Sequence, residues 1–131
     1  MGVRFEFDRG NRVLLVRLDG RLSEESLGAL ILAGEKSWAA TKPRAEIVDC
    51  LAVTDFDISS DRIRQQAKWQ PMPDAANLPR VLVVPRTHAY GLARMYQITS
   101  EERRPLVTVV NTLDEALAAL GVTSPHFEPL D

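Results

Sequence analysis

The chain has 131 residues, a net charge of −2 at pH 7 and a single cysteine, Cys50. This length is typical of one domain with its own core, and one cysteine excludes a disulfide framework within the chain. The weak negative charge gives no general attraction to nucleic acid, so we expect no such partner. We find no signal-peptide pattern and no apolar run long enough to span a membrane, and we expect a soluble, cytoplasmic protein of bacterial type.

The N-terminal segment predicts a β-hairpin. Val3, Phe5 and Phe7 alternate with polar residues, as in a strand with one exposed face. Residues 8–11 have turn chemistry, and the nearly continuous apolar run over 12–18 predicts a second strand that is covered on both faces.

A long amphipathic helix follows the hairpin. Ser23 is the expected N-cap, and Thr41-Lys42-Pro43 ends the helix. The spacing predicts a buried apolar stripe made of Leu27, Leu30, Ile31, Gly34 and Trp38. A third strand over 45–50 and a loop are expected next.

The second half of the chain repeats the alternation of helix and strand. We expect a helix over 60–70, a proline-rich loop over 70–79 and a strand over 80–84. A third helix starts at Thr87, and its shared face consists of Ala89, Leu92, Ala93 and Tyr96. A strand over 106–110 precedes a last helix, which begins with the capping box Thr112 to Glu115 and stops at Gly121.

This order predicts an α/β domain with a five-stranded mixed sheet and about four helices. The first hairpin is antiparallel, and the remaining strands should be mostly parallel because each is reached through a helix. We expect one domain over residues 1–122 and a loosely ordered C-terminal tail over 123–131.

Three segments carry a resemblance to a known family. In this chain a predicted strand leads to Asp49, and a loop then leads to Asp57-Ile58-Ser59-Ser60. This order is similar to the pattern of the STAS domain family, which has a strand, Asp, a loop, Asp-Ser-Ser-Gly and a helix. Segments 84–96 and 112–122 resemble that family's later strand–Pro–helix segment and its last helix. Segments 3–22 and 90–96 look more like the stand-alone SpoIIAA-like (STAS/SEC14-type) branch. The resemblance implies a STAS fold over most of the chain, and for this branch apolar cavities and lipid-like ligands.

The chain departs from the family pattern at the phosphoacceptor. In the family the phosphorylated serine follows the aspartate directly, and here Ile58 stands at that position. Ser59 and Ser60 are the remaining candidate phosphoacceptors, because backbone N–H groups at a helix N-terminus favour phosphate. The simpler interpretation, which we favour, is that one serine only caps the helix.

The neighbouring acids Asp55, Asp57 and Asp61 form a candidate partner loop. Counted from Asp55, an EF-hand would need Gly and Glu where Ser60 and Gln66 stand, so we expect no calcium site. We expect no other metal and no cofactor, because nucleotide-binding motifs are absent and the chain has only two histidines.

The sequence leaves three hypotheses about the function of this chain. The leading one is a non-catalytic binding or regulatory module for a protein partner or a small apolar ligand, with homodimerisation possible in principle. Large side chains outside the core pattern mark its candidate surface: Trp69, Met72, His88, Tyr90, Met95 and Tyr96. The second is a phospho-switched antagonist of an anti-sigma factor with Ser59 as acceptor. The least favoured is a hydrolase that uses Cys50 or Ser59 with His88, because no nucleophile elbow or oxyanion loop is present.

Overall fold

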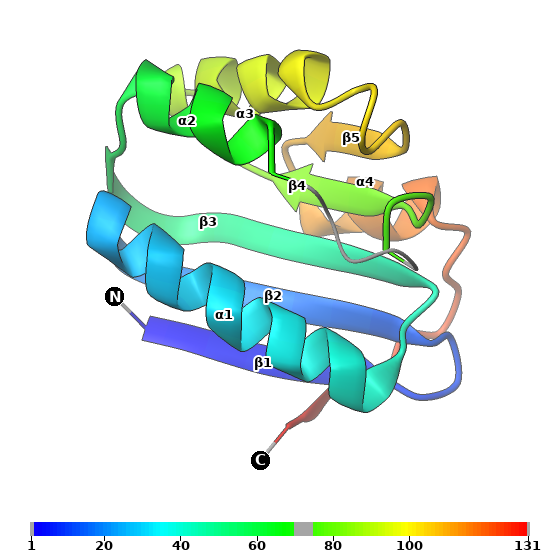
Figure 1. Ribbon diagram of the computed structural model, residues 1–131. Coiled ribbons are helices and arrows are strands. Elements are labelled where there is room, and N and C mark those ends of the chain that lie inside the picture. Colours follow the sequence, from blue (N-terminus) through cyan, green and yellow to red (C-terminus); the bar gives the residue numbers. More distant parts are fainter. Residues whose placement is uncertain (1, 70–74, 131) are drawn as a thin grey trace.

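The computed structural model describes residues 2–69 and 75–130 and has the expected α/β class (Figure 1). One sheet has the strand order β5-β4-β3-β2-β1-β6. The strands are β1 (Gly2–Asp8), β2 (Val13–Ser23), β3 (Ala45–Asp57), β4 (Arg80–Val83), β5 (Val107–Val110) and β6 (Glu128–Pro129). The helices are α1 (Glu24–Thr41), α2 (Ser60–Ala67), α3 (His88–Thr99) and α4 (Leu113–Ala119). The β1–β2 pair is antiparallel and β2 to β5 run parallel, as the sequence predicts.

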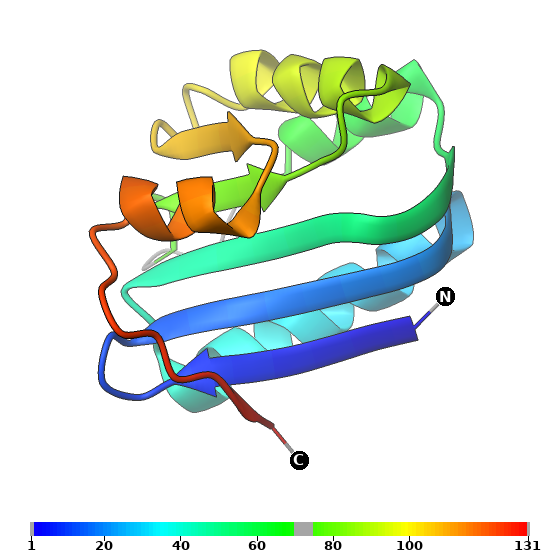
Figure 2. The same ribbon diagram turned by 180° about the vertical axis from the view of Figure 1, so that it is seen from behind.

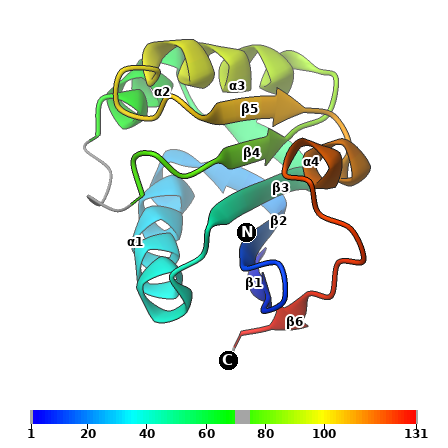
Figure 3. The same cartoon turned by 90° about the vertical axis from the view of Figure 1, so that its right-hand side faces the viewer.

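The helices divide between the two faces of the sheet. Seen along the sheet edge, α1 and α4 lie on opposite sides (Figure 3), and the view from behind shows α4 and the C-terminal segment on their own face (Figure 2). Strand β2 is buried from both sides, because Val13 and Leu15 belong to the core beneath α4 while Leu14, Val16 and Leu18 belong to the opposite core. This confirms the prediction of a strand covered on both faces.

No helix in the described part of the chain is both long enough and apolar enough to cross a membrane. The longest, α1, has 18 residues, and its sequence includes Glu24, Glu25, Glu35 and Lys36. This helix ends where Lys42 takes a left-handed conformation, with φ of 47°, and its N–H donates to the Trp38 carbonyl at 2.8 Å. The expected stop at Thr41-Lys42-Pro43 is therefore confirmed.

Strands β2 and β3 are longer than the sequence predicts. The prediction ended the third strand at Cys50 and placed a loop after it, and this was wrong: parallel pairing continues from Asp19↔Ala52 to Ser23↔Asp57. The register shifts twice, between Arg17 and Asp19 and again between Gly20 and Arg21. Each shift changes which residues face the core, so a regular alternation of apolar and polar residues is lost where the strand continues.

A sixth strand comes from the segment that was expected to be a loose tail. Glu128 and Pro129 pair antiparallel with β1, and the N–H of Leu130 donates to the Phe5 carbonyl at 2.8 Å. Proline is compatible with this position because an edge strand can lack one N–H donor. The predicted strand number was one too low, since a two-residue strand has no periodicity to detect.

Asp8 ties the first hairpin to the C-terminal segment. Its carboxylate is almost fully buried and accepts hydrogen bonds from the Asn11 N–H at 2.9 Å, the Asn11 Nδ2 at 2.8 Å and the His126 N–H at 3.0 Å. Burial acts to raise the pKa of Asp8, but these hydrogen bonds outweigh it and lower the pKa below 3.8.

We expect Asp8→Asn to lower the free energy of unfolding by about 1–3 kcal/mol at pH 7, because an amide cannot replace a carboxylate that accepts three N–H groups. The lowered pKa means that the contribution of Asp8 is fully present above its unfolded pKa and is lost as the pH falls through the folded value. Urea unfolding at pH 7 and at pH 3 should show a smaller difference between variant and wild type at the lower pH. Glu102→Gln, at an exposed position, is the control and should change little; equal losses at both pH values would contradict the assignment.

Candidate functional site

The apolar stripe of α1 faces a cavity. All five stripe residues, Leu27, Leu30, Ile31, Gly34 and Trp38, line a cavity of about 250 Å³ on one face of the sheet. The prediction that they are buried was wrong, since α1 contains no buried residue and these five remain half-buried. An amphipathic helix normally buries such a stripe fully against the core. In α1 the stripe borders a cavity and is only half-buried.

The apolar face of α3 lines the same cavity from the other side. The four residues predicted to share that face are Ala89, Leu92, Ala93 and Tyr96, and all of them contribute to the lining. Ile63 and Gln66 of α2 add to this wall, and Val16, Val48 and Leu82 of the central strands form the floor. The cavity therefore lies between two helical walls that belong to opposite halves of the sequence.

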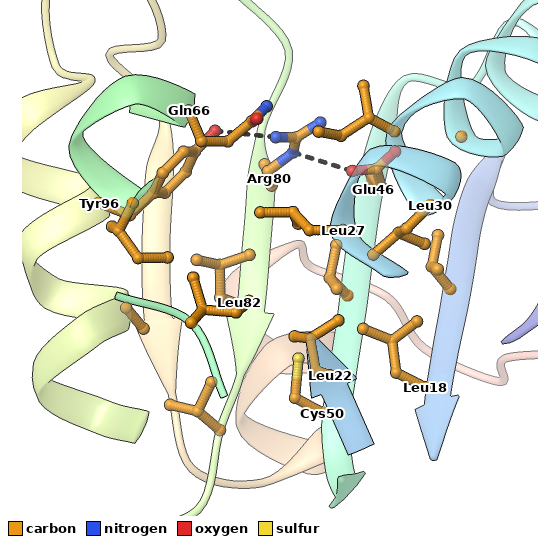
Figure 4. A pocket seen from close by; sticks show the side chains of 18 of the residues that line it. Leu18, Leu22, Leu27, Leu30, Glu46, Cys50, Gln66, Arg80, Leu82 and Tyr96 are labelled. Carbon is orange, nitrogen blue, oxygen red and sulfur yellow. Dashed lines mark hydrogen bonds and ion pairs between the residues drawn. The ribbon is translucent and has the colours of Figure 1, made fainter. Parts of the chain in front are cut away.

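The two ends of the cavity differ in chemistry (Figure 4). Leu18, Leu22 and Cys50 lie at one end. A cluster of four polar side chains, called the polar cluster below, lies at the other end: Glu46, Gln66, Arg80 and Tyr96. Arg80 Nε is 2.8 Å from Glu46 Oε1, and Arg80 Nη1 donates to the Tyr96 hydroxyl at 2.9 Å. Burial acts to lower the pKa of Arg80, but the charge of Glu46 and the contact with Tyr96 outweigh it and raise the pKa.

The residues proposed as a ligand or partner surface separate into different places. Trp69 and Tyr96 line the cavity, and Trp69 is 50% exposed. His88 and Tyr90 are exposed and Met95 is half-buried, and none of the three contributes to the lining. The His88 ring packs edge-on against Phe56, with ring centroids 6.1 Å apart. Met72 lies outside the described residues.

Sequence reasoning missed the polar end of the cavity. Glu46 and Arg80 each stand at the beginning of a buried strand and are direct neighbours in the β3–β4 register. Charged residues at such positions usually reach solvent at the sheet edge, so their sequence positions alone do not predict that they line a cavity. The signal available in the sequence is that these two residues have opposite charges and each begins a predicted apolar strand, because opposite charges on adjacent strands stabilise each other.

The acidic segment before α2 is part of a strand. Asp55 and Asp57 lie on β3 and both contact Arg21, with Asp55 Oδ2 3.5 Å from Arg21 Nε, whereas Asp61 lies in the first turn of α2 and pairs with Arg64 at 3.0 Å. The expectation of an acidic loop was therefore wrong for Asp55 and Asp57. The reason is the extension of β2, which places Arg21 beside these two carboxylates.

Ser59 caps α2, and Ser60 is the first residue of that helix. The Ser59 Oγ accepts from the Arg62 N–H at 3.1 Å and donates to Glu24 Oε1 at 2.9 Å, which joins the beginning of α2 to the beginning of α1. Both serines are exposed, whereas the preceding Ile58 is buried and lines the cavity. At the position where the STAS pattern has its phosphoacceptor, this chain has an apolar cavity residue.

Cys50 is only 7% exposed, and burial, with a smaller effect from the charge of Asp49, raises the pKa of its thiol to about 12. A thiol with this pKa is protonated at neutral pH and is a poor nucleophile. His88 does not share the cavity that Cys50 lines. The geometry therefore offers no support for the hydrolase hypothesis.

Comparison with known proteins adds no assignment. A scan against models of protein families and a search of curated proteins both found no match to the chain. Within residues 2–69 and 75–130, no cluster of three or more His, Cys, Asp or Glu side chains could hold a metal ion.

We expect Ser59→Ala to lower the free energy of unfolding by about 1 kcal/mol, because the variant loses the α2 cap and the bond to Glu24. Ser60→Ala is the matched control and should leave stability nearly unchanged, since Ser60 does not cap the helix. Urea denaturation of the two variants makes the comparison, and equal effects would contradict the role of Ser59.

We expect Cys50 of the folded protein to react with iodoacetamide about a thousandfold more slowly than Cys50 of the unfolded chain at pH 8. The shift of its pKa from 9.0 to about 12 reduces the thiolate fraction by this factor before burial is considered. Mass spectrometry of labelling time courses with and without guanidinium chloride measures the ratio. Similar rates in the two states would show that Cys50 is accessible and ionised.

Proposed function

We propose that this chain is a non-catalytic binding or regulatory module of the STAS, SpoIIAA-like kind that takes a small apolar ligand into the cavity between α1 and α3. The carrying observation is that the apolar stripes of both helices line this one cavity, and that the α1 stripe is only half-buried there. Ligand sites are typically concave and mostly apolar, with a few polar groups that orient the ligand. The cavity has both properties, with leucines at one end and the polar cluster around Arg80 at the other.

The energetics support this proposal. A fully buried leucine or isoleucine side chain contributes about 1.5–3 kcal/mol, and a half-buried one contributes only part of this. Leu27, Leu30 and Ile31 are half-buried around the cavity, so burial contributes only part of this free energy at each of them. A ligand that fills the space would remove this apolar surface from water, which provides the driving force for binding.

The phospho-switch is the alternative that a specific observation favours. Ser59 is exposed and its hydroxyl donates to Glu24, so a phosphate on Ser59 would face a carboxylate instead. Repulsion between the two would separate the beginnings of α1 and α2 beside the cavity. A protein partner or a second copy of this chain remains a further hypothesis for the exposed Trp69 and Tyr90.

We expect straight-chain alcohols to bind with affinity that rises about fourfold for each added methylene, because each buried methylene contributes about 0.8 kcal/mol. An apolar cavity of about 150 Å³ holds one benzene, so by proportion 250 Å³ accommodates about ten non-hydrogen atoms. The increase should therefore stop near decanol. Both tryptophans of the chain, Trp38 and Trp69, line the cavity, so their fluorescence during titration with hexanol, octanol, decanol and dodecanol reports binding directly.

Two glycines of α1 provide a matched pair of variants. A Cβ atom at either Gly34 or Gly28 would meet no atom within 4 Å, but only Gly34 lines the cavity. Both changes to leucine should favour the helix by removing a glycine from its interior. Gly34→Leu should abolish decanol binding while Gly28→Leu preserves it; binding that survives in both variants, or in neither, would contradict a ligand site at this cavity.

A further inference from the structure

The polar end of the cavity contains an arginine–glutamate ion pair and one further arginine, Arg104. Arg80 and Glu46 neutralise each other at 2.8 Å, and their side chains are 23% and 13% exposed. Arg104 lines the same cavity and is also half-buried. Its Nη1 makes one long hydrogen bond of 3.5 Å to the Ala75 carbonyl. Among residues 2–69 and 75–130, no carboxylate forms an ion pair with Arg104.

Two further polar groups at this end have unused hydrogen-bonding capacity. The Tyr96 hydroxyl accepts from Arg80, so its own proton is free to be donated. Gln66 Oε1 is buried and has no hydrogen-bond partner among the described residues. A buried polar atom without a partner is costly, and a turn of the terminal amide would bring the N–H₂ donor of Gln66 to the position of this oxygen. Figure 4 shows Gln66 and Tyr96 on the same side of Arg80, at the end opposite Cys50.

The charges favour a ligand with a single negative charge. Burial and the nearby charge of Arg80 lower the pKa of the Arg104 guanidinium, and the smaller opposing effects of Tyr96 and Glu46 do not outweigh them. Glu35 is the other charged residue of the lining, but it is exposed and its charge is screened by water. With Arg80 already paired to Glu46, Arg104 is left as a guanidinium without an ion pair among residues 2–69 and 75–130, and one such charge suits a monoanionic carboxylate better than a dianionic phosphate.

We infer that the ligand is a single-chain amphiphile with a carboxylate head, held by Arg104 and Tyr96, and an apolar chain that extends toward Leu22 and Cys50. This inference rests on the proposed function, because it specifies the ligand of the same cavity. Arginine binds carboxylates through two parallel N–H groups, and such charge-assisted hydrogen bonds are stronger than neutral ones. Gln66 can present its amide N–H₂ to the head group by turning its terminal amide.

The test compares decanoate, decanol and decyl phosphate, followed through the fluorescence of Trp38 and Trp69. The variants are Arg104→Gln, which removes the charge, and Arg104→Lys, which keeps it. Arg103→Gln is the matched control, because it changes the net charge equally at the adjacent residue, which does not line the cavity. Circular dichroism of each variant establishes that it is folded before binding is measured.

We expect Arg104→Gln to weaken decanoate binding about tenfold or more, with decanol affected less than about twofold. Arg104→Lys should retain most of the affinity for decanoate, and Arg103→Gln should behave as the wild type. Equal losses for decanoate and decanol, or decanoate binding that Arg104→Gln leaves unchanged, would overturn the assignment of the head group. Tighter binding of decyl phosphate than of decanoate to the wild type would overturn the choice of a carboxylate.

The outcomes separate the two proposals. Binding of decanol to the wild type without a specific effect of Arg104 on decanoate would leave the apolar cavity as a ligand site and reject only the carboxylate head. Failure of decanol and decanoate alike would reject the cavity as a ligand site, and the carboxylate proposal with it. If Arg104→Gln does not fold, Arg104→Lys and the wild type provide the test. The carboxylate proposal then requires that both bind decanoate at least as tightly as decanol, and weaker binding of decanoate in either would overturn it.

Discussion

The long parallel pairing of β2 with β3 is the constraint on which the rest of the molecule depends. These strands continue to Ser23↔Asp57, whereas β4 and β5 have four residues each. Because α1 follows directly from β2, and α2 follows closely after β3, the pairing places the beginnings of both helices side by side, joined by the Ser59–Glu24 hydrogen bond. The strands that lie beneath then form the floor of a cavity that α1 lines from one side and α3 from the other.

This arrangement concentrates unusual chemistry at one end of an apolar space. Arg80 is held between Glu46 and Tyr96, where low exposure strengthens electrostatic interactions and also makes unpaired groups costly. Arg104 adds a second guanidinium, which forms no ion pair among residues 2–69 and 75–130. On the opposite face Val13, Leu15 and Ala116 are fully buried in the core beneath α4, and the buried Asp8 accepts three hydrogen bonds from within the chain. At the polar end of the cavity, by contrast, Gln66 Oε1 is buried without a hydrogen-bond partner among the described residues.

The order of elements and the mixed sheet were predictable because each depends on local periodicity and on caps such as Ser23, Thr87 and Thr112. The extension of β3 was not predictable, because the bulges in β2 interrupt the alternation. Strand β6 was missed because it has two residues and is stabilised by β1, which is distant in sequence. For the candidate site, Trp69 and Tyr96 were anticipated as part of a ligand surface, whereas Glu46, Arg80 and Arg104 were not.

The sequence by itself determined which side chains share a face on α1 and on α3, because helical spacing depends only on residues that are close in the chain. Only the tertiary structure decided that the two faces line one cavity. The physical reason is that the distance between two helices on a sheet depends on which strands they cover, and strand order is set by long-range pairing. Such pairing also brings Glu46 and Arg80 side by side at one end of that cavity, which Arg104 lines too, although the three are separated along the chain.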